Sequence, residues 1–391
     1  MKANLIELPG RDLWHLITYK FRICPTVSQE KILNETIETC RCLYNKALAD
    51  RIQNHSKFYD QEKVLVVRAK KQNKHLKAVH SQVLLDALFR VDKSFKAFFA
   101  GIARFPKFKR YGRFNSFSCP QSGFKLEGNR LYLSKIGSVK IVLHRKISGV
   151  VKRVTVIRDI DQWFVALTVI EESSTLPKSP EIAVGVDSGL LNLVALSDGT
   201  IIENPRTLKQ SVERIKSLQR QLSRKKKGSH NREKARIGLA KAWRKVRRQR
   251  DDFSHKLSHK FSAENNVVVF EDLKISNLVR NHNLASAIMD ATWGKLRVMT
   301  AYKAERRGGR VVLVTPYGSS QKCSRCDWIS PTKLTLKDRV FHCLNCGLIL
   351  DRDVNAAGNI LKAGLEQSLA ETEPLLIRRI SKFQSRKQRS P

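Results

Sequence analysis

The sequence has no long apolar segment. Within its 391 residues, no run of apolar side chains approaches the length of about 20 that a membrane-spanning helix needs. The first residues, MKANLIELPGRDLWHL, also lack the apolar core of a secretion signal. We therefore expect no membrane span and no secretion, and we expect the protein in the cytoplasm.

Acidic residues are few relative to basic ones. Asp and Glu total 35 against 74 Lys and Arg, and the formal net charge of +39 is spread along the chain. Such a charge attracts polyanions over long distances, and nucleic acid is the usual partner. A ribosome-associated or simply soluble basic protein, and a protein that binds an acidic membrane surface, are the alternatives. Hydrophobic residues make up 41%, enough for sizeable cores, and the length fits two to four modules.

The sequence also lacks heptad repeats and has few cysteines. The sequence contains no heptad repeat of the kind that forms coiled-coil dimers, and we expect a monomer. Cysteine occurs only eight times. Cys24, Cys40, Cys42 and Cys119 are scattered, and scattered cysteines in a reducing cytosol behave as small core side chains. The other four lie close together late in the chain.

The first part of the chain predicts a β-rich domain with a helical insertion. Residues 17–24 alternate apolar and basic side chains, as a strand does. Thr26 and Gln29 have the spacing of a capping box, so one helix should run to about Asn54 and a second from about 80 to 100. Short strands separated by turns follow at 124–170. We expect a small β-barrel or meander over residues 1–174, with helices inserted at about 27–103.

A segment at residues 104–116, RFPKFKRYGRFNS, interleaves aromatic and basic side chains. This pattern suits phosphate contacts combined with base stacking. The alternative is a basic loop whose aromatic rings dock on the domain, and both can hold. The candidate nucleic-acid contacts are Arg104, Lys107, Lys109 and Arg110.

The second part of the chain predicts an α/β core. After a linker at 175–180, strands at 182–186, 193–196 and 200–202 form an antiparallel start. Further strands are expected at 267–270 and 310–315, and helices at about 289–307 and from about Val354 to Glu366. The core would occupy 180–322 and 351–369, and a basic disordered tail would follow at 370–391.

A basic helical hairpin is expected within this core, at about 206–264. Between Arg220 and Lys260 the sequence has sixteen Lys or Arg and three acids, and the segment KKKGS at 225–229 breaks the helical pattern. Like charges this dense repel one another unless a polyanion offsets them. We therefore favour a surface for nucleic acid over the solvated face of a structural hairpin. The candidate contacts are Arg224, Lys225, Lys226, Lys227, Arg232 and Arg236.

Four cysteines have the spacing of a zinc site: Cys323-x2-Cys326-x16-Cys343-x2-Cys346. Thiolates paired in this way form two knuckles, which together give tetrahedral four-sulfur coordination. Such a closed site is structural rather than catalytic. Zinc would fold the segment 323–350, which lacks a core of its own. His342 adjoins the third cysteine, and we regard it as a bystander.

Three acidic residues stand at the ends of predicted elements. Asp187 ends the strand at 182–186, Glu271 ends the strand at 267–270, and Asp353 lies at the start of the last helix. An acid at the end of a buried strand is costly without a cationic partner, and a divalent metal is the natural one. Mg²⁺ prefers carboxylates plus water and phosphate oxygens, and Mn²⁺ could replace it. Two such ions, about 4 Å apart, would support in-line displacement at phosphate.

Each acid also has an ordinary structural interpretation. Asp187 could form a turn, and Asp351 or Asp353 could cap a helix. Asp351 is therefore the rival to Asp353 as the third ligand. Asp272 should point to the opposite face of its strand from Glu271, so we leave it out of the site. The three acids together, in basic surroundings, favour a metal-dependent nuclease.

Several long blocks carry a family resemblance. They include GVDSGL at 185–190, VVFEDL at 268–273, SSQKCSRC at 319–326 and DRDVNAAGNIL at 351–361. YKFRICPTVSQEKILNE at 19–35 and DATWGKLRVMTAYKAERRGGRVV at 290–312 extend them over nearly the whole chain. With these blocks in this order, the chain resembles the TnpB family of transposon proteins, which are relatives of type V CRISPR effector nucleases.

The resemblance implies a fold and an activity. The fold would be an N-terminal wedge-like β-barrel with a helical insertion, then an RNase H-like domain of the RuvC type with an inserted zinc ribbon. Such proteins cut double-stranded DNA beside a short flanking motif, guided by RNA from the transposon end. By motif position, Asp187, Glu271 and Asp353 would hold two Mg²⁺ ions, and Cys323, Cys326, Cys343 and Cys346 would hold zinc. The protein would act as a monomer on its RNA, in the nucleoid of a prokaryote.

Two positions depart from the family pattern without removing a ligand. The residue after the second cysteine, often glycine, is Asp327, so that knuckle would need another way to turn. The middle residue of the first acidic block is Ser188. The alternatives are a catalytically idle RNA-guided regulator of transposition, a transposase accessory factor, a strand-transfer transposase and a junction resolvase. The intact acids argue against the first, and the last would require a symmetric dimer.

Overall fold

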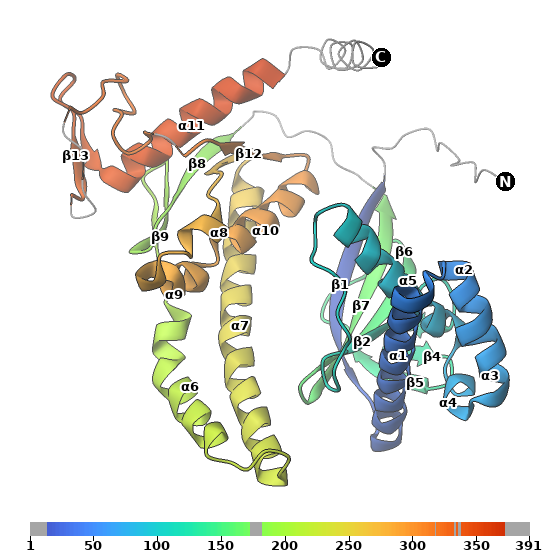
Figure 1. The fold of residues 1–391 in the computed structure, drawn as a ribbon. Helices are drawn as coiled ribbons and strands as arrows, with labels where there is room; N and C mark the ends of the chain where they lie inside the picture. The colour runs from blue at the N-terminus through green and yellow to red at the C-terminus, as the bar shows by residue number, and fades with distance from the viewer. Residues whose placement is uncertain (1–13, 173–181, 317, 332–333, 335–337, 372–391) are drawn as a thin grey trace, which may run out of the picture. The chain divides into compact units, whose positions relative to one another are not determined.

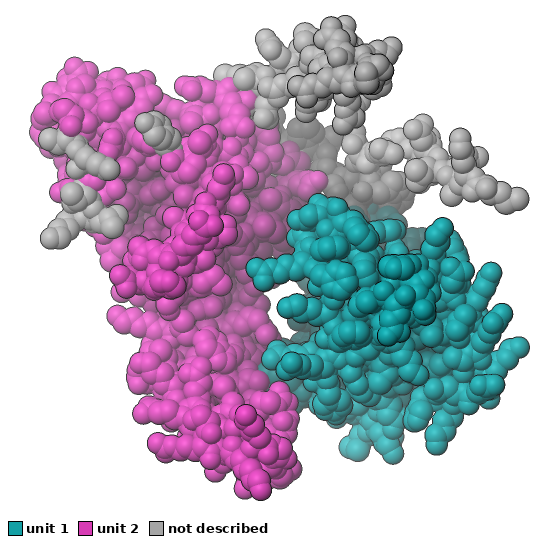
Figure 2. All heavy atoms as spheres, viewed as in Figure 1, with its two compact units in different colours: residues 1–174 teal, residues 175–391 magenta. Residues whose placement is uncertain are grey.

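The computed structural model describes residues 14–172, 182–316, 318–331, 334 and 338–371. The chain divides into two compact units, Met1–Ser174 and Thr175–Pro391, which have separate colours in Figure 2. The linker predicted at 175–180, and all but the first two residues of the tail predicted at 370–391, lie outside the described residues. Across the described ranges, no helix has the length and apolar character needed to cross a membrane.

Unit 1 is built on one antiparallel sheet of seven strands, in the order β2-β6-β7-β1-β5-β4-β3. The central strand pairs with β7 from Trp14 to Ile23, and with β5 only from Arg22 to Cys24. Its alternate residues are buried, as the pattern at 17–24 predicts. The strands are β1 (Trp14–Cys24), β2 (Ser116–Cys119), β3 (Phe124–Glu127), β4 (Arg130–Leu133), β5 (Gly137–Val142), β6 (Val150–Asp159) and β7 (Gln162–Glu172).

The expected β-barrel is an open, curled sheet. Strands β2 and β3 form its two edges, and within the described residues they are not paired with each other. The short strands predicted at 124–170 are confirmed as β3 to β7. The sequence does not predict β2, because its four residues continue directly from the aromatic and basic segment.

The helical insertion begins at the predicted capping box. Thr26 Oγ1 accepts from the backbone N–H of Gln29, and the Gln29 side chain accepts from the backbone N–H of Thr26. The two expected helices are confirmed as α1 (Val27–Asn54) and α5 (Ser81–Phe99), which pack against each other (Figure 1). Four short helical segments join them: α2 (Phe58–Gln61), the π-helical η1 (Glu62–Arg68), α3 (Ala69–Gln72) and α4 (Lys74–Lys77).

Unit 2 contains a five-stranded sheet in the order β10-β9-β8-β11-β12. The strands β8 (Ala183–Ser188), β9 (Asn192–Leu196) and β10 (Ile201–Glu203) are antiparallel to one another in sequence order, which confirms the predicted start of this unit. The strands β11 (Val267–Glu271) and β12 (Arg310–Val314) run parallel to β8. Strand β8 is therefore central, and its C-terminal end lies at the same edge as that of β11.

Helices cover both faces of this sheet. On one face, Val268 and Phe270 belong to a core with Phe261 of α7 (His230–Glu264) and Leu296 of α10 (Trp293–Glu305). On the other face, the alternate residues of β11 pack with α11 (Arg352–Glu371). The expected helical hairpin is formed by α6 (Thr207–Ser223) and α7, shown in Figure 1. The helices α8 (Ile275–Leu278) and α9 (His282–Ala291) were not predicted.

Helix α11 packs so closely on β8 that the backbones of the two elements are in contact at Gly185. A Cβ atom added to Gly185 would lie 2.1 Å from the carbonyl oxygen of Ala357 and 2.7 Å from the backbone nitrogen of Leu361. A Cβ atom added to Gly185 therefore has no room. The close approach brings the start of α11 to the part of the sheet where β8 ends.

Replacing Gly185 with alanine should lower the free energy of unfolding by about 3 kcal/mol, because helix and strand must separate. Gly238→Ala is the matched control. Gly238 lies inside α7, and its added Cβ would meet only Cδ2 of Leu218, at 3.9 Å. This control should gain up to about 1 kcal/mol from the better helix former. Denaturant unfolding of both variants tests the contact, and equal stabilities would contradict it.

Candidate carboxylate site and cysteine cluster

Asp187 and Glu271 lie on neighbouring parallel strands. Phe270 of β11 is aligned with Val186 of β8, and each acid is the next residue along its strand. The residues before them, Val184 to Val186 on β8 and Val267 to Phe270 on β11, are all buried. Apolar strand interiors thus place two carboxylates together at one edge of the sheet.

Asp353 reaches this edge from the first turn of α11. Its side chain is 19% exposed, and its Oδ2 lies 3.8 Å from Nη1 of Arg339. The contact between α11 and Gly185 places the helix start close to Asp187. The structure therefore brings the three predicted acids into one neighbourhood.

The electrostatics of Asp187 reflect this neighbourhood. Burial, followed by the negative charges of Glu271 and Asp353, raises the pKa of Asp187 to about 7. The N–H of Ser188 and the guanidinium of Arg352 act in the opposite direction on this pKa, by smaller amounts. Burial also raises the pKa of Glu271, against a hydrogen bond from Ser319. Burial and mutual repulsion disfavour the charged forms of these carboxyl groups, and a bound cation would stabilise them.

Asp351 and Asp272 have other roles. Asp351 Oδ1 accepts from the backbone N–H groups of Asp353, at 2.8 Å, and Val354, at 3.2 Å, so it caps α11. Asp272 is exposed and pairs with Arg297 at 2.9 Å. Asp272 is thus engaged in an ion pair, and one oxygen of Asp351 is engaged in the cap, which is one of the two interpretations of that residue.

The structure adds a residue that the acidic pattern does not reveal. Ser319 Oγ donates to Glu271 Oε1 at 2.7 Å and so orients this carboxylate. The loop that carries Ser319 is fixed from α11, because Asn359 Nδ2 donates to the carbonyl oxygens of Ser319 at 2.7 Å and Lys322 at 2.6 Å. Ser319 and Asn359 both lie inside conspicuous sequence blocks, SSQKCSRC and DRDVNAAGNIL, and those blocks are the only sequence signal for them.

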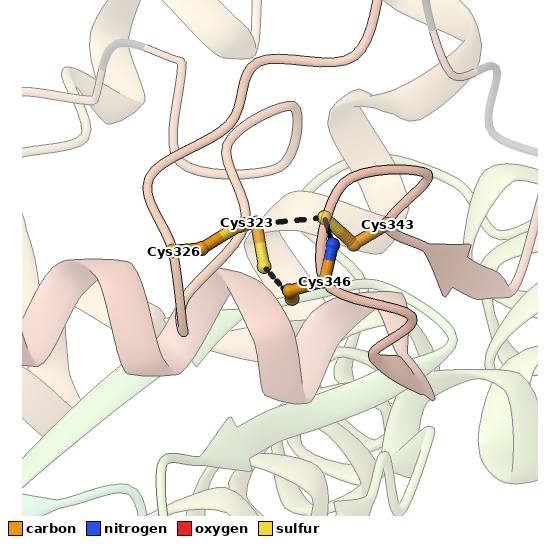
Figure 3. Close-up of side chains that lie close together, drawn as sticks. All are labelled: Cys323, Cys326, Cys343 and Cys346. Atoms are coloured by element: carbon orange, nitrogen blue, oxygen red, sulfur yellow. Dashed lines mark hydrogen bonds between the residues drawn. The ribbon is translucent and has the colours of Figure 1, made fainter.

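The four clustered cysteines converge as their spacing predicts. Figure 3 shows the side chains meeting from two loops. All four sulfur atoms lie within 4.8 Å of one another, with Cys323 and Cys346 at 3.7 Å and Cys326 and Cys343 at 3.5 Å. A tetrahedral zinc with Zn–S bonds of about 2.3 Å needs sulfurs about 3.8 Å apart, so the cluster could hold a zinc ion. In the described part of the chain, only this group meets the 4.8 Å spacing, and the three carboxylates are more widely spaced.

The two knuckles have matching backbone geometry. Cys323 N–H donates to the carbonyl of Trp328 at 2.8 Å, and Cys343 N–H donates to that of Leu348 at 2.9 Å. The amide of Asp327 donates to the Cys323 carbonyl at 3.1 Å, and that of Gly347 donates to the Cys343 carbonyl at 2.9 Å. Strands β13 (Val340–His342) and β14 (Ile349–Asp351) flank the second knuckle.

Asp327 replaces the turn glycine by adopting the same backbone conformation. Its φ is 62°, close to the 72° of Gly347 in the other knuckle. Aspartate tolerates this left-handed region better than most residues. Its carboxylate also lies 3.1 Å from Nζ of both Lys322 and Lys362. The first knuckle therefore turns without glycine and is tied to α11 through Lys362.

The predicted nucleic-acid contacts of unit 1 divide into two groups. Arg104, Lys107 and Arg110 are exposed. Lys109 is anchored: its N–H donates to Asn45 Oδ1 at 2.8 Å, and its carbonyl accepts from Arg41 at 2.8 Å. Part of the loop thus docks on α1, and the remainder presents its cations to solvent.

The predicted contacts of the hairpin also divide. Arg224, Lys225, Lys226 and Lys227 are exposed at the turn between α6 and α7. Arg232 Nη1 instead donates to the carbonyl oxygens of Leu222 at 2.7 Å and Lys225 at 2.8 Å, so it holds the turn in shape. Arg236 forms a two-point pair with Glu233 on an exposed surface.

We expect one zinc ion per chain, and we expect Cys343→Ser to lose it. A missing thiolate leaves an open, weaker site, and the segment 323–350 has only a small core, built around Phe341 and the cysteines. Cys42→Ser is the control, since Cys42 is an exposed thiol outside the cluster. Metal analysis of both purified variants tests the assignment. Full zinc content in Cys343→Ser would contradict it.

Three family models match parts of the chain. A model described as a probable transposase covers residues 166–282, and one described as a Cas12f1-like TNB domain covers 293–360. A third, described as a helix-turn-helix domain, covers residues 15–58. In this chain those residues form β1 and the single long helix α1, followed by the first residue of α2.

Relatives match over most of their length. A protein of Streptomyces pristinaespiralis with the name "Putative RNA-guided DNA endonuclease" is 37% identical, over 90% of each chain. A similarly named protein of Escherichia coli (strain K12), InsQ, is 33% identical over 89% of this chain and 92% of its own. The fold is also similar to that in a cryo-EM structure of a Cas12f1–sgRNA–target DNA complex. That match has a TM-score of 0.57 and 13% identity, and it covers 89% of this chain and 98% of the other. With such relatives and these sequence blocks, the chain belongs to the TnpB family of transposon-associated proteins.

Proposed function

We propose that this chain is an RNA-guided DNA endonuclease in which Asp187, Glu271 and Asp353 hold divalent metal ions. Residues 180–322 and 351–369 would form an RNase H-like nuclease core of the RuvC type. Residues 323–350 would form its zinc ribbon, and residues 1–174 a wedge-like domain. The observation that carries the proposal is the burial of Asp187 beside two further carboxylates, which raises its pKa to about 7.

The carboxylate neighbourhood fits Mg²⁺ in its chemistry. Hard divalent cations prefer oxygen ligands, and carboxylates that repel one another in a desolvated place are stabilised when such a cation binds. Two bound ions would supply an activated water and neutralise the leaving oxygen of a phosphodiester. The raised pKa values of Asp187 and Glu271 support this assignment, because a bound cation would stabilise the charged forms that burial disfavours.

The chain's own residues would position this chemistry. Ser319 holds one oxygen of Glu271, which fixes the direction in which the carboxylate presents its other oxygen. Asp351 fixes the first turn of α11, and this sets the place of Asp353. Arg352 adds a positive charge that acts on Asp187 and could also attract a phosphate.

The proposed partners are a guide RNA from the transposon end and a double-stranded DNA target beside a short flanking motif. Base pairing would read the sequence, so the protein mainly needs contacts to the backbones. The net charge of +39 and the exposed cations at Arg104, Lys107 and the α6–α7 turn suit that task. We propose a monomer on its RNA, acting on DNA in the prokaryotic nucleoid.

The decisive experiment uses the chain co-expressed with its native transposon flank. The purified complex is given Mg²⁺ and a plasmid library in which the sequence matching the guide lies beside random flanks. We expect RNA-dependent cleavage by the wild type. Glu271→Gln and Asp187→Ala should each reduce the cleavage rate by at least about a thousandfold, because each loses a metal ligand.

Neighbouring acids provide matched controls. Asp272→Asn alters the residue beside Glu271 but removes only an exposed ion pair, so cleavage should stay within about threefold of the wild type. Asp351→Asn keeps a side-chain oxygen that can cap α11, so both stability and cleavage should stay close to those of the wild type. Tight target binding without cleavage by the wild type would instead identify an idle RNA-guided regulator. A purified chain without any defined RNA would contradict guidance.

The raised pKa of Asp187 predicts a pH dependence of the protein without Mg²⁺ or Mn²⁺. Between about pH 4 and 7 the folded state holds a proton that the unfolded state has released, so stability falls as the pH rises. The difference is at most about 4 kcal/mol. Asp187→Asn should lack this decline and be more stable than the wild type near pH 8.

Denaturant unfolding at pH 5 and pH 8 measures this effect as a difference between the two proteins. Comparing differences cancels the contribution of groups that titrate in both. Adding Mg²⁺ at pH 8 should stabilise the wild type and leave Asp187→Asn nearly unchanged. Parallel pH profiles for the two proteins would contradict the raised pKa of Asp187.

A further inference from the structure

Four phenylalanine rings form a platform at the C-terminal end of α5. Phe95 contacts Phe99, with ring centres 6.1 Å apart, and Phe105, at 5.7 Å. Phe98 contacts the same two rings, each at 5.3 Å. We call these four residues the aromatic platform. Phe95 is buried and anchors the group, whereas Phe99 is 77% exposed and Phe105 is 46% exposed.

The backbone holds the platform in a fixed shape. Helix α5 ends in a left-handed turn at Gly101, with φ of 69°. The amides of Gly101 and Ile102 donate back to the carbonyls of Phe98 and Ala97, both at 2.9 Å. This closure is a common helix C-cap. It turns Ile102, which is 81% exposed, to the surface immediately after the platform. Exposed apolar groups on a rigid support are a binding surface rather than a folding defect.

The surroundings of the platform are strongly basic, and the acid that precedes them, Asp92, is paired with Arg51 and Lys96. Residues 93–115 contain seven Lys or Arg and no acidic residue. A hollow of about 530 Å³ adjoins the platform, and its lining includes Lys93, Ala97, Arg104, Phe105 and Lys107. Exposed rings beside cations, without acids, complement a ligand that combines flat apolar faces with negative charge. Unpaired nucleotides combine phosphates with base faces that are free to stack, whereas a base in a duplex already stacks on its neighbours.

We propose that the aromatic platform stacks unpaired nucleotides of the guide RNA, with Arg104 and Lys107 holding the adjacent phosphates. This inference rests on the proposed function for the identity of the RNA. Guide RNA is favoured over target DNA because the apolar surface is large and permanent. A guide stays bound throughout the search for a target and so covers the platform continuously, whereas a target strand would leave it open to solvent most of the time.

The test compares two exposed rings of unit 1. Phe99→Ala removes the platform's most exposed ring. Tyr59→Ala removes a ring that is 73% exposed but stands in a segment where Asp60 and Glu62 offset the neighbouring lysines, so it offers a polyanion no net positive charge. Each variant is the full chain, stripped of nucleic acid. The ligands are the RNA that co-purifies with the wild type, a short oligouridylate, a short oligothymidylate and an RNA duplex.

We expect Phe99→Ala to bind the co-purified RNA and the oligouridylate about tenfold more weakly, and the RNA duplex as the wild type does. Tyr59→Ala should match the wild type throughout. The salt dependence separates the two kinds of contact. Phe99→Ala should keep the slope of log affinity against log salt, whereas Lys107→Gln should reduce it by about one unit.

Three results would overturn the proposal. They are an equal loss for duplex and unpaired RNA, a loss confined to the oligothymidylate, and no loss for any ligand. The second would identify single-stranded DNA as the occupant. Thermal unfolding of each variant shows whether the fold is intact, and Ile102→Ser serves as a second platform-edge variant. Failure of the proposed function can be distinguished from failure of this proposal. If the wild type lacks RNA-dependent cleavage but Phe99→Ala still weakens oligouridylate binding, the proposed function is wrong and the stacking of unpaired RNA on the platform stands.

Discussion

The backbone contact between α11 and β8 is the constraint on which the rest of unit 2 depends. Helix and strand come so close that only glycine fits at position 185. This closeness brings the first turn of a helix near the end of β8 and of its neighbour β11, which are far apart in sequence from α11. The carboxylates of Asp187, Glu271 and Asp353 come together because the apolar residues of β8, β11 and α11 pack against one another. The carboxylates themselves repel one another. The hydrophobic core thus holds together groups that electrostatics alone would separate.

Local signals in the sequence predict much of the fold. The start of α1 is predictable because the capping box involves only Thr26 and Gln29 and their own backbone. The alternating and apolar strands of both units are predictable because their pattern also lies within a few consecutive residues. The open sheet of unit 1 is not, since whether β2 meets β3 depends on the curvature of the whole sheet. Helix α9 also escapes prediction, because its sequence, HNLASAIMDA, begins with polar residues that resemble a loop.

The candidate site divides along the same line. The position of Asp187 and Glu271 at strand ends follows from the apolar runs before them, and the cysteine cluster follows from its spacing. Asp351 and Asp353 could not be separated in sequence, because both stand where a helix cap or a ligand could be. Only the hydrogen bonds of Asp351 to the first amides of α11 assign it to the cap. The sequence block at 319–326 draws attention to Ser319 but does not give its role, because that role depends on a contact with a residue 48 positions away.

The asparagines of α11 give the cysteine cluster a reach beyond its own fold. Asn355 binds the Lys322 carbonyl at 2.8 Å and the Ser324 amide at 2.9 Å, on either side of Cys323. Asn359 continues the link to the carbonyl of Ser319, whose hydroxyl partly offsets the rise that burial causes in the pKa of Glu271. A metal held by the four cysteines would therefore be linked, through Asn355, Asn359 and Ser319, to Glu271, one of the proposed metal ligands. Loss of that metal would then disturb the position of Ser319 and the direction of the Glu271 carboxylate, although the cysteines do not contact either residue.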